Sequence, residues 1–291
     1  MDNKVPISIL IMTKNEEKNI RQCLESVKWA DEIFIVDSQS EDRTLDIAGE
    51  YTDKIYQFEW NGKFPKKKNW SIKNMSFSHE WVLMLDADEI VPESLGAEIR
   101  SILENDQGCS GFVARFNYYF LGKLIRYGDP VRKVVFFKHK KASYEELDDS
   151  ALEDRADVEV HEHQIINGKV GFLKTRITHN DQRDLYYYFN RHNRYSSWEA
   201  YLLETHRYDR GAGKNINGKS FRDWLSLRRT LKRFFYRLPC KPLIYFFYTY
   251  ILRFGFLDGY PGFAYNVCKA IYIYEIELKR YEIRRRARES V

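Results

Sequence analysis

Two aspartates, Asp86 and Asp88, come directly after an apolar run at residues 81–85. Five apolar residues bounded by polar ones predict a buried strand, and in an extended chain residues two apart point to the same side. The two carboxylates should therefore face one point, where their repulsion favours a cation with oxygen ligands, Mg²⁺ or Mn²⁺, which most often holds phosphates. The alternative is that one aspartate caps the helix that Pro92 begins and the other is solvated.

Length and composition predict a folded protein without a membrane span. The chain has 291 residues, 44% of them hydrophobic and 31% charged, which is enough for a core in one or two domains. No apolar run approaches the roughly 18 residues of a membrane span and no signal-peptide pattern is present, so we expect a cytoplasmic protein. The scattered cysteines predict neither a disulfide framework nor a zinc site: Cys23, Cys109, Cys240 and Cys268.

The net charge of +5 is divided unevenly along the chain. Residues 220–291 contain 15 Lys and Arg against 6 Asp and Glu, a balance of +9, whereas the other 219 residues have a balance of −4. Eighteen of the 46 aromatic residues also lie in residues 220–291. A soluble surface does not normally carry so many aromatic side chains, so the two parts should face different partners.

Strands and helices alternate before Pro92. The pattern predicts strands at residues 6–12, 32–37, 54–58 and 81–85, with a helix after each of the first three, the third of about a dozen residues after Pro65. This alternation predicts a parallel sheet, in which ligands bind beyond the carboxyl ends of the strands. Polar residues follow three of those ends: Thr13, Asn15 and Glu17; Asp37 and Ser38; Asp86 and Asp88. Three convergent sets favour a nucleotide site, and no glycine-rich dinucleotide or P-loop motif is present.

The segments at these strand ends resemble the signature segments of inverting family 2 glycosyltransferases with the GT-A fold. They are Ile-Ser-Ile-Leu-Ile-Met-Thr-Lys-Asn-Glu-Glu, Ile-Phe-Ile-Val-Asp-Ser-Gln-Ser-Glu-Asp-Arg-Thr and Val-Leu-Met-Leu-Asp-Ala-Asp-Glu. The match covers about residues 5–95, and within the family the chain is most similar to bacterial lipopolysaccharide-core glucosyltransferases of the inner membrane. The resemblance implies an α/β catalytic domain at residues 1–210, with a Rossmann-like, mostly parallel sheet.

The resemblance also implies roles for the strand-end residues. Asp88 would bind the metal directly, Asp86 would lie against the ribose or the metal, and Ser38 would be part of the nucleotide site. Four residues would bind the nucleotide, with Asp37 at the uracil: Thr13, Asn15, Glu17 and Asp37. The family often has Tyr or Phe where Lys14 stands, which weakens the expectation of stacking on the base.

Further candidates lie outside the three signature segments. In the family a basic residue followed by Asn lies close to the sugar nucleotide, which makes Lys68 and Asn69 candidates here, with Lys66 and Lys67 as weaker ones. Arg132 matches an arginine that leads a strand, where it would meet a phosphate or pair with an acid.

An inverting transfer needs a general base for the acceptor hydroxyl and a Lewis acid for the departing diphosphate. Glu162 is the predicted base, because residues 160–162 resemble the Val-His-Glu segment of the lipopolysaccharide-core relatives; the alternative is a solvent-exposed glutamate on an edge strand. Three other carboxylates are second choices: Asp129, Asp154 and Asp157. Residues 140–157 are strongly acidic and are expected to form a mobile loop over the site.

A late histidine completes the metal site in many GT-A enzymes. His179 is the first choice and His161 competes with it, while either one could instead be a hydrogen-bonded core histidine. A neutral imidazole beside two carboxylates would suit Mn²⁺ better than Mg²⁺.

The remainder of the chain predicts helices. A tyrosine-rich helix at residues 184–207 and a glycine-rich linker at 211–218 precede a helical, basic and aromatic region at 219–291. Apolar and basic residues of 221–238 fall on opposite helical faces, which is typical of a helix in a membrane interface, and the polybasic stretch 284–288 suits anionic lipid. The alternative is that these helices pack on the catalytic domain or on a second copy in a homo-oligomer. No nucleic-acid motif is present, so nucleic acid is not an expected partner.

Together these features predict a peripheral enzyme on the inner face of the cell membrane. It would transfer a hexose, with glucose the first choice, from a UDP-sugar to a lipid-linked saccharide such as lipopolysaccharide core, with Mn²⁺ or Mg²⁺ as cofactor. Transfer to polyprenyl phosphate is an alternative that needs no strong base. A non-catalytic sugar-nucleotide-binding or membrane-scaffold protein is a second alternative, and it predicts nucleotide binding without turnover.

Overall fold

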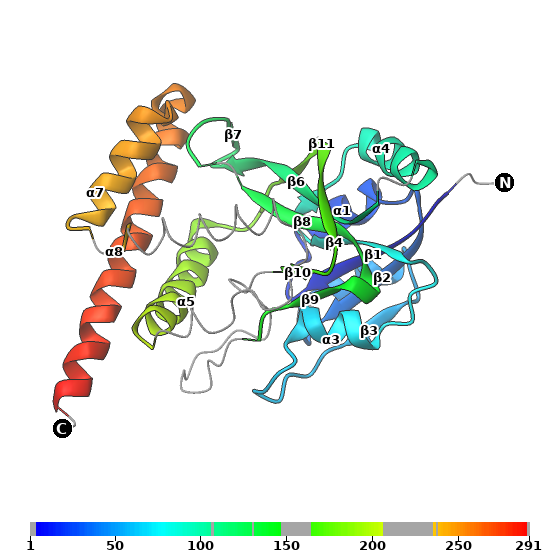
Figure 1. Cartoon of the computed structure of the whole chain (residues 1–291), viewed down its shortest axis with the longest axis horizontal. Helices are drawn as coiled ribbons and strands as arrows, with labels where there is room; N and C mark the ends of the chain where they lie inside the picture. The colour runs from blue at the N-terminus through cyan, green and yellow to red at the C-terminus, as the bar shows by residue number, and fades with distance from the viewer. Residues whose placement is uncertain are drawn as a thin grey trace.

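A large mixed sheet with helices on both faces forms one part of the molecule, and long helices gather at one end (Figure 1). The computed structural model describes residues 4–105, 108–129, 131–146, 164–205, 235–236 and 238–289. The strands are β1 (Val5–Thr13), β2 (Ala30–Asp37), β3 (Ile55–Gln57), β4 (Trp81–Asp86), β5 (Glu89–Ile90), β6 (Cys109–Phe120), β7 (Lys123–Ile125), β8 (Arg132–Lys138), β9 (Ala142–Tyr144), β10 (Gln164–Ile166) and β11 (Lys169–His179). The helices are α1 (Ile20–Ser26), α2 (Thr44–Gly49), α3 (Lys67–Asn74), α4 (Glu93–Glu104), η1 (His139–Lys141), α5 (Leu185–Glu204), α7 (Lys241–Phe246), η3 (Phe247–Leu252), η4 (Gly255–Asp258) and α8 (Gly259–Glu289).

The strand order of the large sheet is β3-β2-β1-β4-β8-β6-β11-β5, and β7 pairs with β6. The first four strands are parallel neighbours, as the alternation of strands and helices predicts. β8 then runs antiparallel to both β4 and β6, β11 is parallel to β6, and β5 is antiparallel to β11. The expectation of an α/β fold with a Rossmann-like, mostly parallel first half and a helical C-terminal region is confirmed.

β1 is buried on both faces because apolar side chains occupy consecutive positions. Ile9 and Ile11 belong to the core that α1, α2 and α4 cover, whereas Leu10 and Met12 belong to the core on the side of α3. Successive side chains of a strand point to opposite faces, so a continuous apolar run is needed when helices cover both. This rigid central strand fixes where its last residue, Thr13, lies.

Two sequence expectations about the middle of the chain are corrected. The helix after Pro65 has 8 residues and begins at Lys67, rather than spanning about a dozen. Residues 140–157 were expected to be a loop, but 142–144 form β9, which pairs antiparallel with β10. Asn69 of α3 holds β9 in place: its Nδ2 donates to the Tyr144 carbonyl oxygen at 3.0 Å, and its Oδ1 accepts from the Tyr144 amide at 2.8 Å. Residues 147–157 lie outside the described residues.

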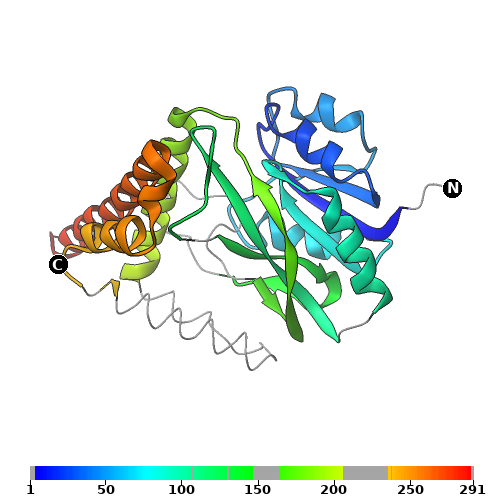
Figure 2. The same ribbon diagram turned by 90° about the horizontal axis from the view of Figure 1, so that it is seen from above.

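α5, α7 and α8 form a separate helical group beside the sheet (Figure 2). α7 and η3 run antiparallel to α8, and α5 packs between α8 and the sheet (Figure 1). Lys279 of α8 donates to α5 at the Asn193 carbonyl oxygen, 2.6 Å away, and at the Ser196 hydroxyl, 2.7 Å away. α5 therefore joins the sheet domain to the C-terminal helices, and the division into domains at 1–210 and 219–291 stays a prediction. No helix among the described residues is both long enough and apolar enough to cross a membrane.

Candidate functional site

The three strand ends singled out in the sequence meet at one edge of the sheet. Thr13 is aligned with Asp37 between β1 and β2, and Met12 is aligned with Asp86 between β1 and β4. The Thr13 hydroxyl donates a hydrogen bond of 2.8 Å to the buried Asp37 carboxylate. The parallel register thus places these polar residues where ligands bind in open α/β sheets.

The Asp37 carboxylate is fixed by several donors. Ser40 donates to it from its amide at 2.7 Å and from its hydroxyl at 2.6 Å, and Gln57 Nε2 lies 3.2 Å from its second oxygen. The Ser38 amide donates to the Thr13 carbonyl oxygen at 3.1 Å. Fixed carboxylates of this kind suit the recognition of one ligand group, and nucleotide binding by Thr13, Asp37 and Ser38 stays a prediction.

The loop after β1 is fastened to the loop after β2. Asn15 has a φ of 54°, a left-handed conformation that Asn adopts more readily than most residues, and its side-chain oxygen accepts from the Glu41 amide at 2.9 Å. Glu17 is exposed and accepts from the Arg43 amide at 3.3 Å. Both candidates shape the rim of the site, and their contact with a nucleotide stays a prediction.

Asp86 ends β4, and Asp88 lies in the turn that follows. The expectation that both carboxylates extend from one continuous strand is wrong, because the chain turns immediately after Asp86 before β5 begins. Lys133 Nζ lies 2.7 Å from Asp86 Oδ2 and 2.5 Å from Glu89 Oε1. Burial raises the pKa of Asp86, but the charge and hydrogen bond of Lys133, together with the charge of Lys68, hold this pKa below its ordinary value. Neither aspartate caps α4, whose N-cap residue is Pro92 without a side-chain capping bond.

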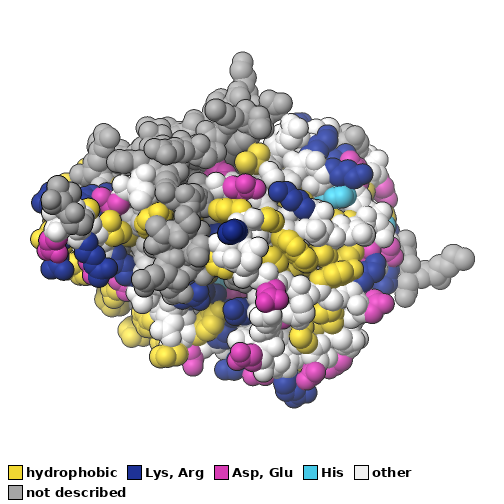
Figure 3. All heavy atoms as spheres, turned by 90° about the horizontal axis from the view of Figure 1, so that it is seen from below, with side chains coloured by type: hydrophobic (Ala, Val, Ile, Leu, Met, Phe, Trp, Pro, Cys, Tyr) yellow, Lys and Arg dark blue, Asp and Glu magenta, His cyan; other side chains and the backbone are white. Residues whose placement is uncertain are grey.

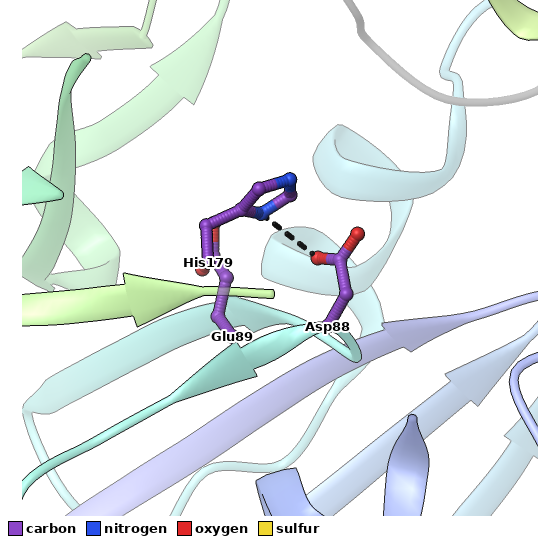
Figure 4. Close-up of side chains that lie close together, drawn as sticks. All are labelled: Asp88, Glu89 and His179. Atoms are coloured by element: carbon purple, nitrogen blue, oxygen red, sulfur yellow. Dashed lines mark ion pairs between the residues drawn. The ribbon is translucent and has the colours of Figure 1, made fainter. Parts of the chain in front are cut away.

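Three basic side chains lie around the Asp88 carboxylate. His179 Nδ1 is 3.2 Å from Oδ1, while guanidinium nitrogens of Arg183 and Arg191 are 3.6 Å and 3.9 Å from Oδ2. Figure 4 shows the imidazole of His179, at the end of β11, turned toward Asp88. Burial lowers the pKa of His179, but the charge and hydrogen bonding of Asp88, together with the charge of Glu89, raise this pKa above its ordinary value. The fold brings the two residues together because β11 pairs with β5, the strand that follows Asp88.

Asp88, Glu89 and His179 offer ligand atoms to one divalent cation, since these atoms lie within 4.8 Å of one another. Among the described residues, Asp88 Oδ1 is buried without a hydrogen bond of acceptable geometry, even though His179 Nδ1 is near. Two ligand atoms about 2.1 Å from a cation and at right angles are roughly 3 Å apart, close to the 3.2 Å between these atoms. The residues therefore fit Mg²⁺ or Mn²⁺, and the imidazole favours Mn²⁺. Metal binding by Asp86, Asp88 and His179 stays a prediction.

A network of charges extends from Asp88 to the loop after β1. Arg183 lies 2.6 Å from Glu16 and 2.7 Å from Asp181, and Arg191 lies 3.3 Å from Asp181. Burial raises the pKa of Glu16 to about 7, although the charge of Arg183 acts in the opposite direction. Sequence reasoning did not single out Glu16, Arg183 or Arg191. Two features of the sequence could have identified these residues. Glu16 lies in the first signature segment, and Arg183 and Arg191 follow shortly after His179.

Lys133, which bridges Asp86 and Glu89, was also missed, and its neighbour Arg132 was chosen instead. Arg132 is exposed, and it lies at the start of β8 beside Arg115 of β6. Adjacent residues of a strand point to opposite faces, so a shift of one position decides which cation reaches the carboxylates. A phosphate contact of Arg132 stays a prediction.

The lysine run at the start of α3 is largely buried rather than solvated. Lys66 is 1% exposed, and Lys67 Nζ donates to the Thr13 carbonyl oxygen at 2.9 Å. Lys68 Nζ lies 5.4 Å from the centre of the Tyr144 ring and is near enough to lower the pKa of Asp86. The sugar-nucleotide contacts of Lys68 and Asn69 stay predictions, and Asn69 uses its side chain to hold β9.

The predicted general base lies outside the described residues, and so do its neighbours in sequence. This applies to Glu162, to the second histidine candidate and to two of the alternative bases: His161, Asp154 and Asp157. Asp129 is described and is exposed. Burial lowers the pKa of Lys269 on α8, and the negative charge of Asp129 acts in the opposite direction. Asp129 therefore lies near α8, on the side of the helical group.

Comparisons with known proteins agree with these motifs. The model of glycosyl transferase family 2 matches residues 8–125. An uncharacterized glycosyltransferase of Rickettsia bellii is 25% identical over 261 residues, covering 89% of this chain and 80% of the relative. The lipopolysaccharide core biosynthesis glycosyltransferase LpsC of Rhizobium meliloti is 26% identical over an alignment of 292 residues, covering 96% of this chain and 93% of LpsC. A solved structure, S. aureus TarS 1-349 in complex with UDP-GlcNAc, has a TM-score of 0.31 and 28% identity, covering 40% of this chain and 35% of that chain.

The matched residues 8–125 include most of the elements that build the site. They contain the three strand ends with Thr13, Asp37 and Asp86, and they run to the end of β7. The motifs, the sheet and the relatives along most of the chain agree on one family of enzymes. Residues 8–125 of this chain match glycosyl transferase family 2, and relatives that align along most of the chain are named glycosyltransferases.

Proposed function

We propose that this enzyme transfers a hexose, with glucose our first choice, from a UDP-sugar to a saccharide acceptor on a lipid, such as lipopolysaccharide core. The observation that carries this proposal is the group formed by Asp86, Asp88, Glu89 and His179, at the sheet edge where Thr13 and Asp37 also lie. The similarity to LpsC over nearly the whole of both chains supports the acceptor class.

The charges of the site suit a nucleoside diphosphate. A cation held by Asp88 and His179, with Glu89 or Asp86, would stabilise the negative charge that develops on the diphosphate as it leaves. Arg183 supplies a further fixed positive charge beside Asp88, and guanidinium groups pair well with phosphate oxygens. A carboxylate cluster without these cations would repel the same ligand.

The transfer needs a base on the acceptor side. The acceptor hydroxyl oxygen forms a bond to the anomeric carbon while the bond from that carbon to the diphosphate oxygen breaks, so the configuration inverts. The hydroxyl proton passes to a carboxylate, and Glu162 is our candidate for this role because an ionised glutamate can accept it at neutral pH. An acceptor that is already an anion, such as polyprenyl phosphate, would not need this base.

We also propose that the enzyme acts as a peripheral protein on the inner face of the cell membrane. A saccharide carried on a lipid can be reached only at a membrane surface. The charge balance of +9 and the aromatic content of residues 220–291 support attraction to anionic lipid.

Calorimetric titration of UDP-glucose, UDP-galactose and GDP-mannose, with and without Mn²⁺, tests the donor. We expect one UDP-sugar to bind only with Mn²⁺, and this binding to be lost in Asp88→Asn. Asp46→Asn, at an exposed position on α2, is the matched control and should bind as the wild type does. If no nucleotide sugar binds under either condition, the proposed donor site is wrong.

Sugar transfer to a lipid-linked saccharide by Glu162→Ala and Glu162→Gln tests the base. We expect transfer to fall by roughly 100-fold or more, with binding of the UDP-sugar retained. Full transfer to the saccharide by both variants would reject Glu162 as the base and would point to another carboxylate, such as Asp129. Binding of the UDP-sugar without turnover by the wild type would contradict the proposed reaction.

A further inference from the structure

α7, η3, η4 and the start of α8 lie in the helical group at one end of the molecule (Figure 2). Many of their large apolar side chains are exposed, and we call this set the apolar face. Its most exposed apolar side chains each have more than half of their surface exposed: Leu243, Phe247, Leu252, Phe254, Leu257 and Tyr260. Monomeric proteins rarely leave so many large apolar side chains together in water, so a patch of this kind marks a docking surface.

The helix that carries most of this face is apolar on all sides. Between residues 242 and 252 there is no charged residue, although Thr249 on its inner side is buried and Phe247 on its outer side is 55% exposed. A surface helix normally places polar side chains on its outer side, and a helix that is apolar all round belongs in an apolar environment on every side. The outer side of α7 and η3 therefore lacks an apolar partner in the part of the chain that the structure describes.

The exposed charge at the apolar face is positive. In residues 241–263, Arg253 is the exposed charged residue, while Lys241 lies 2.7 Å from Glu277 and Asp258 is 2% exposed. Lys123 of β7 adds a second cation, since its Nζ lies beside Gly259. The exposed Asp129 is also near, because the amide of its neighbour Gly128 donates to the Arg253 carbonyl oxygen at 3.1 Å, so the exposed charge is positive on balance. Apolar and aromatic side chains with neighbouring cations match the boundary between the acyl chains and the anionic headgroups of a lipid bilayer.

The polybasic stretch near the C-terminus has less free charge than its sequence indicates. Figure 3 shows Lys and Arg side chains intermixed with acidic ones at the end of the molecule where α8 lies. Three successive arginines each have a carboxylate within 3.6 Å: Arg284 with Glu204, Arg285 with Glu289, and Arg286 with Glu282. These pairs offset part of the positive charge that would attract anionic lipid, so this stretch is the weaker candidate for membrane contact.

A second copy of the chain fits the apolar face less well than a lipid surface does. In a two-fold dimer the same surface lies on both sides of the interface. Arg253 would then approach an identical surface on which the exposed cations Arg253 and Lys123 outnumber the one nearby exposed carboxylate, Asp129. Anionic headgroups supply the missing negative charge.

We infer that the apolar face is the surface by which this enzyme docks on a membrane that contains anionic lipid. The inference deepens the proposed function, because it rests on an acceptor carried by a lipid. The apolar side chains of α7, η3 and η4 enter the headgroup region, and Arg253 and Lys123 meet the lipid phosphates.

The apolar face is tied to the candidate metal site through the β6–β7 hairpin. Asp258 of η4 accepts hydrogen bonds of 3.0 Å from the amides of Arg126 and Tyr127, which follow β7. β7 pairs with the end of β6, where the ring of Tyr118 stacks on His179 at a centroid distance of 4.8 Å. Docking through this face would therefore hold the site in one orientation relative to the lipid.

Flotation of the full chain with vesicles tests the inference. One set of vesicles contains phosphatidylethanolamine with phosphatidylglycerol, and the other contains phosphatidylcholine alone. The test variant is the double substitution Phe247→Asp with Leu252→Asp, and the control is Tyr186→Asp, which changes an aromatic residue that is 77% exposed on α5. All three substitutions are at exposed positions, so we expect the variants to fold, and circular dichroism checks this.

We expect the wild type and Tyr186→Asp to float with the anionic vesicles, and the double variant to partition into them about tenfold less or weaker still. Unchanged flotation of the double variant would overturn the inference. A wild type that does not float, but elutes as a dimer that the double variant abolishes, would overturn it in favour of a second copy.

Binding of UDP-sugar by the same variants separates this inference from the proposed function. We expect the double variant to bind the donor as the wild type does, because the substitutions lie outside the candidate site. Flotation lost with donor binding kept supports both proposals. If neither the wild type nor any variant binds a UDP-sugar, the proposed function is wrong. The flotation result then still tests whether the apolar face binds the membrane.

Discussion

At the edge of the sheet, carboxylates and cations are largely buried in close pairs, and apolar side chains fill the core beneath them. On α7 and η3 the arrangement is reversed, because large apolar side chains face outward and charged residues are few. Asp88 is 5% exposed and has three basic neighbours, while Phe247 is 55% exposed. Burying charge is costly unless it is paired, and exposing apolar surface is costly unless it is covered. This contrast underlies our two proposals, a charged ligand at the sheet edge and a lipid surface at the helices.

Matched phenylalanine substitutions should give the largest difference between the regions. Phe136 on β8 is fully buried, so Phe136→Ala should lower the free energy of unfolding by about 3–5 kcal/mol. Phe247→Ala should change it by less than about 0.5 kcal/mol, because the side chain is already exposed. Chemical denaturation of the two variants measures both values. Equal losses would mean that α7 and η3 are packed as tightly as the sheet.

Asp88→Asn should separate activity from stability. Sugar transfer should fall by at least about 100-fold, because a neutral amide is a poor ligand for a hard cation and leaves His179 and two arginines without their common carboxylate. Asp46→Asn should keep its activity. Transfer assays and binding of Mn²⁺ followed by electron paramagnetic resonance check this, and a variant that keeps full Mn²⁺ affinity would exclude Asp88 as a ligand.

Glu32 tests whether buried charge in the sheet domain also has a purely structural use. Its carboxylate accepts from the Ser78 amide at 3.1 Å and from the Ser78 hydroxyl at 2.8 Å, and it also bonds Ser8 and Lys54. Burial raises the pKa of Glu32, but these partners outweigh it and lower this pKa below its ordinary value. Because the native pKa is lowered, the ionised group stabilises the fold above the ordinary carboxyl pKa, and this contribution is lost as the pH falls through the native value.

We therefore expect Glu32→Gln to be less stable than the wild type by about 1–3 kcal/mol at neutral pH, with the difference shrinking in acid. Denaturation curves over a range of pH measure this. A difference that does not change with pH would show that the charge of Glu32 is not what stabilises the native state.

The smallest effect should come from an exposed ion pair on α8. Arg286 lies 2.7 Å from Glu282, one helical turn away, and both side chains are largely exposed. Arg286→Gln should change the free energy of unfolding by less than about 0.5 kcal/mol, because exposed pairs at this spacing contribute little. Thermal unfolding measures the change, and a much larger loss would show that charge on α8 is structural in the way that Glu32 is.

Local patterns in the sequence predict much of the sheet domain and part of the site. The apolar runs gave β1, β2 and β4, and parallel pairing then required Thr13, Asp37 and Asp86 to lie at one edge. The pairing of His179 with Asp88 could not be derived in this way, because it depends on β11 entering the sheet between β6 and β5. Only the resemblance to a family indicated that histidine.

Two features that sequence reasoning missed depend on strand pairing. Arg132 was singled out because it matches an arginine of the family, whereas Lys133 was missed because only the pairing of β8 with β4 and β6 decides which residue faces the carboxylates. Residues 142–144 were taken for a loop because of the acidic run that follows, but Asn69 and β10 supply the hydrogen bonds that make them a strand. Both outcomes depend on contacts with distant segments.

The sequence by itself determined the alternation of strands and helices, the polar residues at three strand ends and the basic, aromatic character of residues 220–291. These are properties of short segments, since side-chain spacing sets which face of a strand or helix is apolar. The tertiary structure decided which cations surround Asp88, which ligand atoms share its space, and that the apolar side chains of α7 and η3 face outward. These depend on strand order and helix packing, which join residues far apart in the chain.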